Sequence, residues 1–123
     1  MDKNELQERL IQFAVLIIKI TNSLLNNKAG NHLAGQIVRS GTSPALNYGE
    51  AQGAESRNDF IHKISIVLKE LRETNINLII IQRVKLSQNE KEIAFAIKES
   101  NELISIFVKS LNTAKKNQEL KIK

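Results

Sequence analysis

The chain has 123 residues, a length that fits a single domain with a substantial core. Hydrophobic residues make up 41% of it and aromatic residues only 4%, so the apolar content is mostly Leu, Ile, Val and Ala, as is typical of helical bundles. The absence of cysteine excludes disulfide scaffolds, thiolate catalysis and cysteine-ligated metals, and it makes a reducing cytoplasm the default expectation. The net charge of +5 is compatible with nucleic acid as a partner.

The first predicted helix covers about residues 3–26. Its apolar residues recur at alternating steps of four and three, which places them on one face: Leu6, Leu10, Phe13, Ile17, Ile20 and Leu24. A second stripe lies beside them: Ile11, Ala14, Ile18 and Leu25. The combined face is wider than one partner helix requires. The mixed charges of the first residues do not resemble a signal peptide, and no apolar run approaches the roughly 18 residues of a membrane span.

The second predicted helix covers about residues 32–54, after a turn at 26–31 that is rich in Asn and Gly. Its inward seam consists mainly of small residues: Ala34, Ile37, Gly41, Pro44, Tyr48 and Ala51. Small residues let a neighbouring backbone approach closely, so we expect this helix to be central. Pro44 leaves two alternatives, a continuous helix kinked near Gly41 or a second segment capped by Ser43. We favour the continuous helix because the apolar phase is unchanged across the proline.

A polar line runs beside this seam, at steps of four, four and three: Arg39, Ser43, Asn47 and Glu50. Glu70 and Glu73 of the next helix are natural ion partners for Arg39 or Lys69. Three interpretations remain open, namely a hydrogen-bond network that sets helix register, a ligand or nucleic-acid site, and plain solvent exposure. We expect the structural network, formed by Arg39, Ser43, Asn47, Glu50, Glu70 and Glu73.

The third predicted helix begins at Ser56, which has Asp59 three residues on as in a capping box, and ends near residue 85. Its stripe consists of Phe60, Ile64, Val67, Leu71, Leu78 and Ile81. Residues 76–86 are apolar nearly all round. A helix with this pattern is buried on several sides, so we expect this end to meet another subunit.

The fourth predicted helix opens at 87–90 with Ser87 and Glu90 in the same capping arrangement. Ile93, Ile97, Ser100, Ile104, Phe107 and Leu111 share its inner row. Beyond it the sequence is lysine-rich: residues 109–123 hold five lysines against one glutamate, while the rest of the chain is nearly neutral. We therefore divide the chain into a four-helix bundle, 1–113, and a basic tail, 114–123, that either grips phosphates or only aids solubility.

Four helices with short connections predict an all-α, up-and-down bundle. Metal-binding bundles use pairs of Glu-x-x-His motifs, whereas this chain offers a single Asp59-x-x-His62 and an isolated His32, so we expect no metal and no other cofactor. No nucleophile elbow and no phosphate-binding loop is present, so we expect no enzymatic activity and no catalytic residue.

The segment RSGTSPALNYGEA at 39–51 and the segment SRNDFIHKISIVLKELRET at 56–74 resemble the bacterial family of 23S rRNA-intervening sequence proteins. The likeness spans nearly the whole chain. The residues that carry it are Arg39, Ser40, Ser43, Asn47, Glu50, Phe60, Lys69, Glu70, Glu73 and Thr74. The family includes relatives of the accessory proteins of diversity-generating retroelements, which are basic pentamers that bind nucleic acid and a reverse transcriptase.

The resemblance implies a left-handed bundle that assembles as a homopentamer, and an association with structured RNA or a ribonucleoprotein in the bacterial cytoplasm. The alternative is a ring that binds a partner protein and does not contact nucleic acid directly. The residues we expect to contact nucleic acid are Arg39, Arg57, Lys115 and Lys116. No small-molecule substrate and no membrane is expected as a partner.

Overall fold

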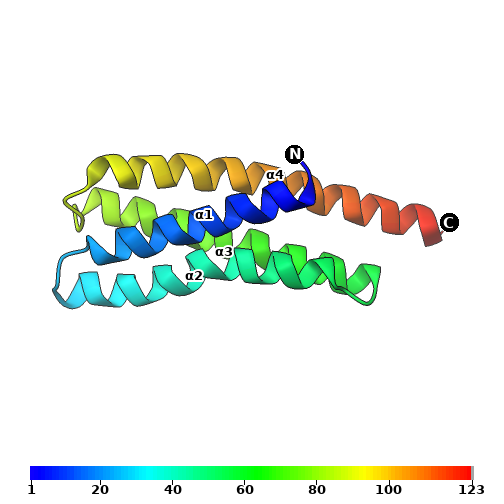
Figure 1. Cartoon of the computed structure of the whole chain (residues 1–123), viewed down its shortest axis with the longest axis horizontal. Coiled ribbons are helices and arrows are strands. Elements are labelled where there is room, and N and C mark those ends of the chain that lie inside the picture. The colour runs from blue at the N-terminus through cyan, green and yellow to red at the C-terminus, as the bar shows by residue number, and fades with distance from the viewer. Residues whose placement is uncertain (123) are drawn as a thin grey trace.

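The computed structural model describes residues 1–122, with side chains through residue 120. Four helices follow one another: α1 (Lys3–Asn22), α2 (Lys28–Gln52), α3 (Arg57–Arg83) and α4 (Glu90–Ile122). They run up and down along one long axis (Figure 1). The predicted all-α four-helix bundle is therefore confirmed.

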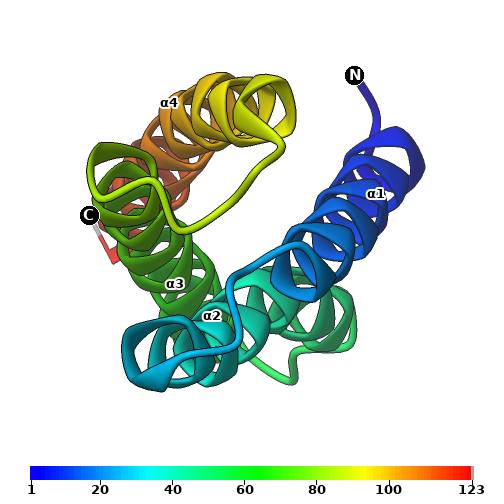
Figure 2. The same cartoon turned by 90° about the vertical axis from the view of Figure 1, so that its left-hand side faces the viewer.

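The four helices do not pack equally against one another. α2 packs extensively on α3, α3 on α4 and α1 on α2, whereas α1 and α4 share far fewer contacts. Seen down the long axis, α1 stands apart from α4 while the other neighbours lie close together (Figure 2). The bundle thus has three closely packed seams and one open seam.

The core is built largely from the predicted apolar stripes, although Leu103 was not among them and Ile97, Ile104 and Leu111 are only partly buried. Its largest fully buried side chains include Leu10, Phe13, Ile17, Ile20, Ile37, Ile64, Leu71, Leu78, Ile81, Ile93, Leu103 and Phe107. Tyr48 stacks edge-on against Phe107, with ring centroids 5.5 Å apart, and burial raises the pKa of its hydroxyl. Each large apolar side chain buried in this way contributes about 1.5–3 kcal/mol to folding.

Side-chain caps fix where the helices begin. The Ser56 hydroxyl accepts a hydrogen bond from the Asp59 N–H at 3.1 Å, which confirms the predicted start of α3. The start predicted for the second helix was wrong by about four residues, because the Asn27 side chain accepts from the Gly30 N–H and caps α2 there. A Cβ at Gly30 would lie 1.9 Å from the Leu25 carbonyl oxygen, so this turn requires glycine.

The expected cap of the fourth helix was also wrong. Asn89 caps α4 by accepting from the Glu92 N–H at 3.2 Å. The Ser87 hydroxyl instead pairs at 2.9 Å with that of Ser23, in the connection between α1 and α2. The Leu25 N–H also donates to the Leu86 carbonyl across these connections. Ser87 therefore joins the two loops at one end of the bundle. Because the Leu25 N–H donates to Leu86 and not to the carbonyl four residues before it, α1 ends at Asn22 and not near residue 26.

Helix α2 continues through Pro44, so the favoured continuity is confirmed and the alternative of a second segment capped by Ser43 is wrong. A Cβ placed on Gly41 would lie 2.6 Å from a side-chain methyl carbon of Ile17. The α1 and α2 backbones therefore approach closely at this glycine, which confirms that the small-residue seam permits close packing.

Helix α4 crosses residue 113 without interruption and runs through Ile122. Its C-terminal turns extend past the ends of the other helices (Figure 1). Residues 114–122 of the predicted basic tail thus belong to this helix, while Lys123 lies outside the described residues. In the described part of the chain, no helix is both long enough and apolar enough to cross a membrane.

Two stripes of apolar residues remain exposed on the outside of the bundle. The α1 stripe consists of Ile11, Val15 and Ile18, and the α3 stripe consists of Ile76, Ile80 and Val84. In the predicted all-round apolar end of α3, Leu78 and Ile81 enter the core and the α3 stripe faces outward. Contact of that end with another subunit stays a prediction.

Candidate functional site

The polar line of α2 forms three separate groups of contacts. Asn47 donates to both the carbonyl and the hydroxyl oxygen of Ser43, at 3.0 and 2.8 Å, within the same helix. Glu50 pairs with Lys63 of α3 at 2.7 Å. The line therefore does not form one continuous network, although two of its three groups connect α2 to α3.

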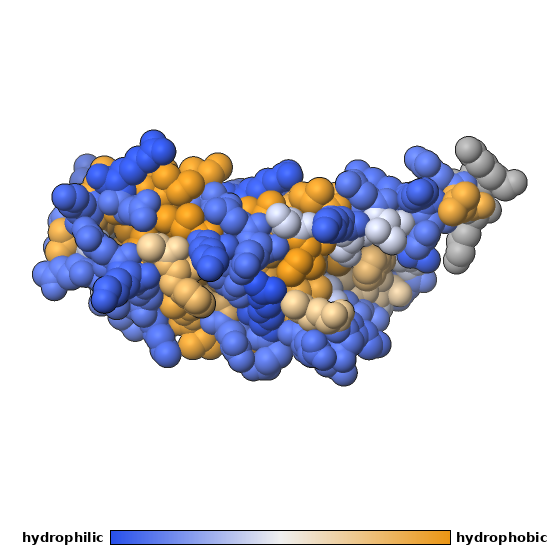
Figure 3. Space-filling model, turned by 90° about the horizontal axis from the view of Figure 1, so that it is seen from above, coloured by the Kyte–Doolittle hydropathy of each residue, from blue (hydrophilic) through white to orange (hydrophobic). Residues whose placement is uncertain are grey.

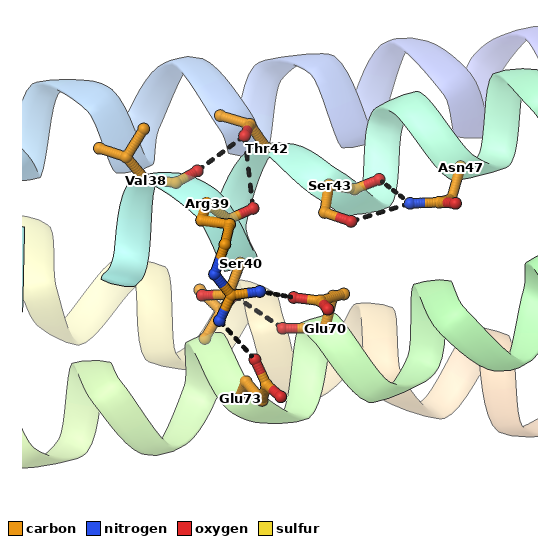
Figure 4. Close-up of polar contacts among 9 residues, drawn as sticks. Val38, Arg39, Ser40, Thr42, Ser43, Asn47, Glu70 and Glu73 are labelled. Atoms are coloured by element: carbon orange, nitrogen blue, oxygen red, sulfur yellow. Dashed lines mark hydrogen bonds and ion pairs between the residues drawn. The ribbon is translucent and has the colours of Figure 1, made fainter. Parts of the chain in front are cut away.

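Arg39 forms the third group, with the two glutamates expected from the sequence. Its guanidinium lies 3.4 Å from the Glu70 carboxylate and 3.3 Å from that of Glu73 (Figure 4). Burial raises the pKa of Glu70 and the Glu73 charge adds to this, whereas the Arg39 charge acts in the opposite direction. The Arg39 side chain is 63% exposed, so part of its five-donor guanidinium faces solvent.

A buried hydroxyl pair lies beneath this ion pair. Ser40 and Thr74 are fully buried and their hydroxyl oxygens lie 2.9 Å apart, joining α2 to α3. The Thr74 hydroxyl also contacts the Glu70 carbonyl at 2.8 Å. Among the described residues, no buried side-chain polar atom lacks a hydrogen-bond partner. The buried polar groups of the α2–α3 seam are thus satisfied internally, and the Arg39 side chain lies exposed at its surface.

The other basic candidates lie towards the C-terminal end of α2, whereas Arg39 stands near the middle of that helix. Arg57 begins α3 and lines a groove together with Lys109 of α4, and Lys115 and Lys116 are exposed further along α4. Thirteen residues of α2 separate Arg39 from the end of that helix, which corresponds to about 20 Å at the α-helical rise. Arg39 therefore does not share one surface cluster with the other three candidates.

A further arginine contact had no signal in the sequence. Arg9 of α1 donates to the Glu99 carboxylate at 2.6 and 2.8 Å and to that of Glu102 at 2.9 Å. The hydrogen bond from Arg9 holds the pKa of Glu99 below its ordinary value, and the same bond raises the pKa of Arg9. The partners are some 90 positions apart in the chain, so periodicity within one helix does not reveal them. This contact bridges the open α1–α4 seam.

The described residues offer no geometry for metal chemistry. In the part of the chain that the structure describes, no three His, Asp or Glu side chains are grouped so that they could hold a metal ion. The Asp59-x-x-His62 pair lies in the first turns of α3 without a third such ligand among the described residues. The charged and hydrogen-bonding side chains described above lie at the surface, where they are suited to binding a partner.

Comparisons with known proteins place the chain among related bundles. The 23S rRNA-intervening sequence protein family matches residues 2–116. Among solved structures, the chain is similar to a protein of unknown function from the S23 ribosomal protein family of Bacteroides thetaiotaomicron, with 31% identity and a TM-score of 0.78. That likeness covers 86% of this chain and 97% of the other. A comparison with curated proteins gave no match.

Proposed function

Since the chain belongs to the family of 23S rRNA-intervening sequence proteins, we propose that it is a non-enzymatic homo-oligomer that associates with structured RNA or a ribonucleoprotein. We place it in the bacterial cytoplasm and expect it to form a ring of five copies. The observation that carries the RNA association is the gathering of unpaired basic side chains at one end of the bundle, on a protein of this family.

The charge distribution supports an RNA partner. Among the described residues, Arg9, Arg39 and Lys63 pair with carboxylates, whereas Arg57, Lys109, Lys115 and Lys116, like the other described lysines and arginines, form no ion pair. Unpaired cations at a surface release counterions from a phosphate backbone and so favour nucleic acid at moderate salt. Arg39 is a weaker candidate for this role because its charge is already balanced by two glutamates.

The outer apolar stripes support self-assembly. Each contributes three branched side chains along one face of its helix, at steps of four and three in α1 and of four and four in α3. Monomeric proteins seldom expose rows of this kind, and such rows commonly mark protein interfaces. We propose that the α1 and α3 stripes contact neighbouring copies in the ring.

A second candidate function, a ring that binds a protein partner without direct RNA contact, is favoured by one observation. Phe95 is 60% exposed and lines a small groove of the open seam with Gln12, Phe13 and Leu16. Apolar side chains are visible on the face formed by α1 and α4 (Figure 3). An exposed aromatic side chain of this kind is a common anchor at protein interfaces.

The test is a titration of the purified protein against a structured ribosomal RNA fragment and an unrelated RNA, each at low and at physiological salt. Our proposal predicts binding that survives physiological salt and prefers the structured fragment. Binding that is equal for both RNAs and lost with salt indicates tail electrostatics alone. With that result, or with no binding, the protein-binding ring becomes the better account.

A further inference from the structure

The groove between the start of α3 and the C-terminal part of α4 has a distinct lining. Its volume is about 460 Å³, and it is formed by Arg57, Phe60, Ile106, Lys109, Ser110, Thr113, Ala114 and Asn117. Arg57 and Lys109 supply positive charge, Ser110, Thr113 and Asn117 supply hydroxyl and amide groups, and Phe60 and Ile106 supply an apolar floor. The hydrogen bond between Asn58 and Gln118 ties the two helices together beside it.

The charge of this lining distinguishes it from three other surface grooves. It contains two cations and, among the side chains described, no carboxylate. The groove next to Arg39 also contains Glu73, the one next to Ser56 also contains Glu55, and the one beside Phe95 contains Glu99. An anionic ligand is therefore attracted to the α3–α4 groove and meets a carboxylate in each of these three, including the one next to Ser56, which shares Arg57 and Phe60 with it.

The lining matches the parts of an unpaired nucleotide. Lys and Arg side chains neutralise phosphate, and an aromatic ring offers a stacking surface to a base. Polar donors beside the floor can hydrogen-bond to base edges that are accessible only when the base is not paired, as in RNA loops and bulges. Phe60 is half-buried, so one part of its ring is held by the core while another part lines the groove.

We propose that this groove receives an unpaired nucleotide of the RNA, with its phosphate at Arg57 and Lys109 and its base against Phe60. The inference rests on the proposed RNA association and adds to it a place and a preference for single-stranded segments. It also adds Phe60 and Lys109 to the basic residues expected from the sequence.

The experiment compares two charge reversals on the same helix, Lys109→Glu in the groove and Lys98→Glu outside it. Both lysines are exposed, so neither change disturbs the core. Each variant replaces one lysine by glutamate, so the two have the same net charge. The probes are a hairpin RNA with an oligouridine loop and a blunt duplex with an equal number of phosphates. Circular dichroism melting and light scattering check the fold and the oligomeric state.

We expect the wild-type protein to prefer the hairpin. Lys109→Glu should lower hairpin affinity by about tenfold at physiological salt, and Lys98→Glu by about twofold or less. Phe60→Leu, which keeps an apolar floor without a ring, should reduce the preference for the hairpin over the duplex.

The outcomes separate the two claims. If the wild-type protein binds RNA but both reversals weaken it equally, or if hairpin and duplex bind alike, the groove assignment is wrong and the RNA association stands. If Lys109→Glu changes the oligomeric mass and leaves RNA affinity intact, the groove is a protein contact. If the wild-type protein binds neither RNA, the proposed function itself fails.

Discussion

Two arginines each join a pair of helices by contacting two glutamates, but they do so in different surroundings. Arg9 bridges the open α1–α4 seam, where its side chain is 26% exposed and its shortest contact is 2.6 Å. Arg39 bridges the closely packed α2–α3 seam, where its side chain is 63% exposed and its contacts are 3.3 and 3.4 Å. Apolar packing already holds α2 to α3, so the ion pair matters more where packing is sparse.

The largest expected effect on stability comes from removing apolar contacts, which we compare between the buried core and the open α1–α4 seam. Ile37 of α2 is fully buried, whereas Leu16 borders the open seam. Ile37→Ala should lower the free energy of unfolding by about 2–5 kcal/mol, and Leu16→Ala by about 1 kcal/mol. Urea unfolding at matched protein concentration measures both, since assembly would add a concentration-dependent contribution. Equal losses would contradict the distinction between the seams.

The next effect is that of Arg9→Ala, which leaves the partly buried Glu99 without its partner. We expect a loss of about 1–2 kcal/mol near neutral pH. Because the folded-state pKa of Glu99 is lowered, its contribution is present above the unfolded pKa of about 4.3 and is lost as the pH falls through the folded value. The difference between wild type and variant should therefore shrink on acidification. A difference that stays constant with pH would show that the ion pair does not stabilise the seam.

Arg39→Ala should change stability much less, by under about 0.5 kcal/mol, because an exposed ion pair is screened by solvent and salt. If Arg39 also contacts RNA, the same substitution should weaken RNA binding severalfold and reduce its salt dependence. Lys69→Ala, an exposed change on the neighbouring helix, is the control. A stability loss as large as that of Arg9→Ala would remove the contrast between the two arginines.

The smallest effect concerns Glu70, whose folded-state pKa is raised by burial. The ionised form is then disfavoured in the fold, so wild-type stability relative to Glu70→Gln should fall as the pH rises through the unfolded pKa towards the folded one. This direction is opposite to that expected for Glu99. Unfolding curves of the two proteins between about pH 4 and 7 measure it, and parallel pH profiles would show that burial of Glu70 has no consequence.

Sequence reasoning succeeded where the contacts are local or periodic. The steps of three and four identified the core faces, and Ser56 with Asp59 located the start of α3. The ion pairing of Arg39 with Glu70 and Glu73 was also expected, because neighbouring helices in an up-and-down bundle bring their facing polar rows together.

Sequence reasoning failed where the deciding partner lies far along the chain. Ser87 resembles a helix cap, but its hydroxyl pairs with Ser23 from another loop, and Asn89 caps the helix. Glu50 was grouped with Arg39, but it pairs with Lys63. The Arg9 contact with Glu99 joins the first helix to the last and leaves no mark on either helix's own periodicity.

Sedimentation of a fluorescently labelled structured RNA with increasing amounts of the wild-type protein, at physiological salt, tests the central claim most directly. Our account predicts that the RNA moves into a faster species whose mass corresponds to one RNA and several copies of the chain. RNA that sediments unchanged while the protein remains folded would contradict the proposed RNA association.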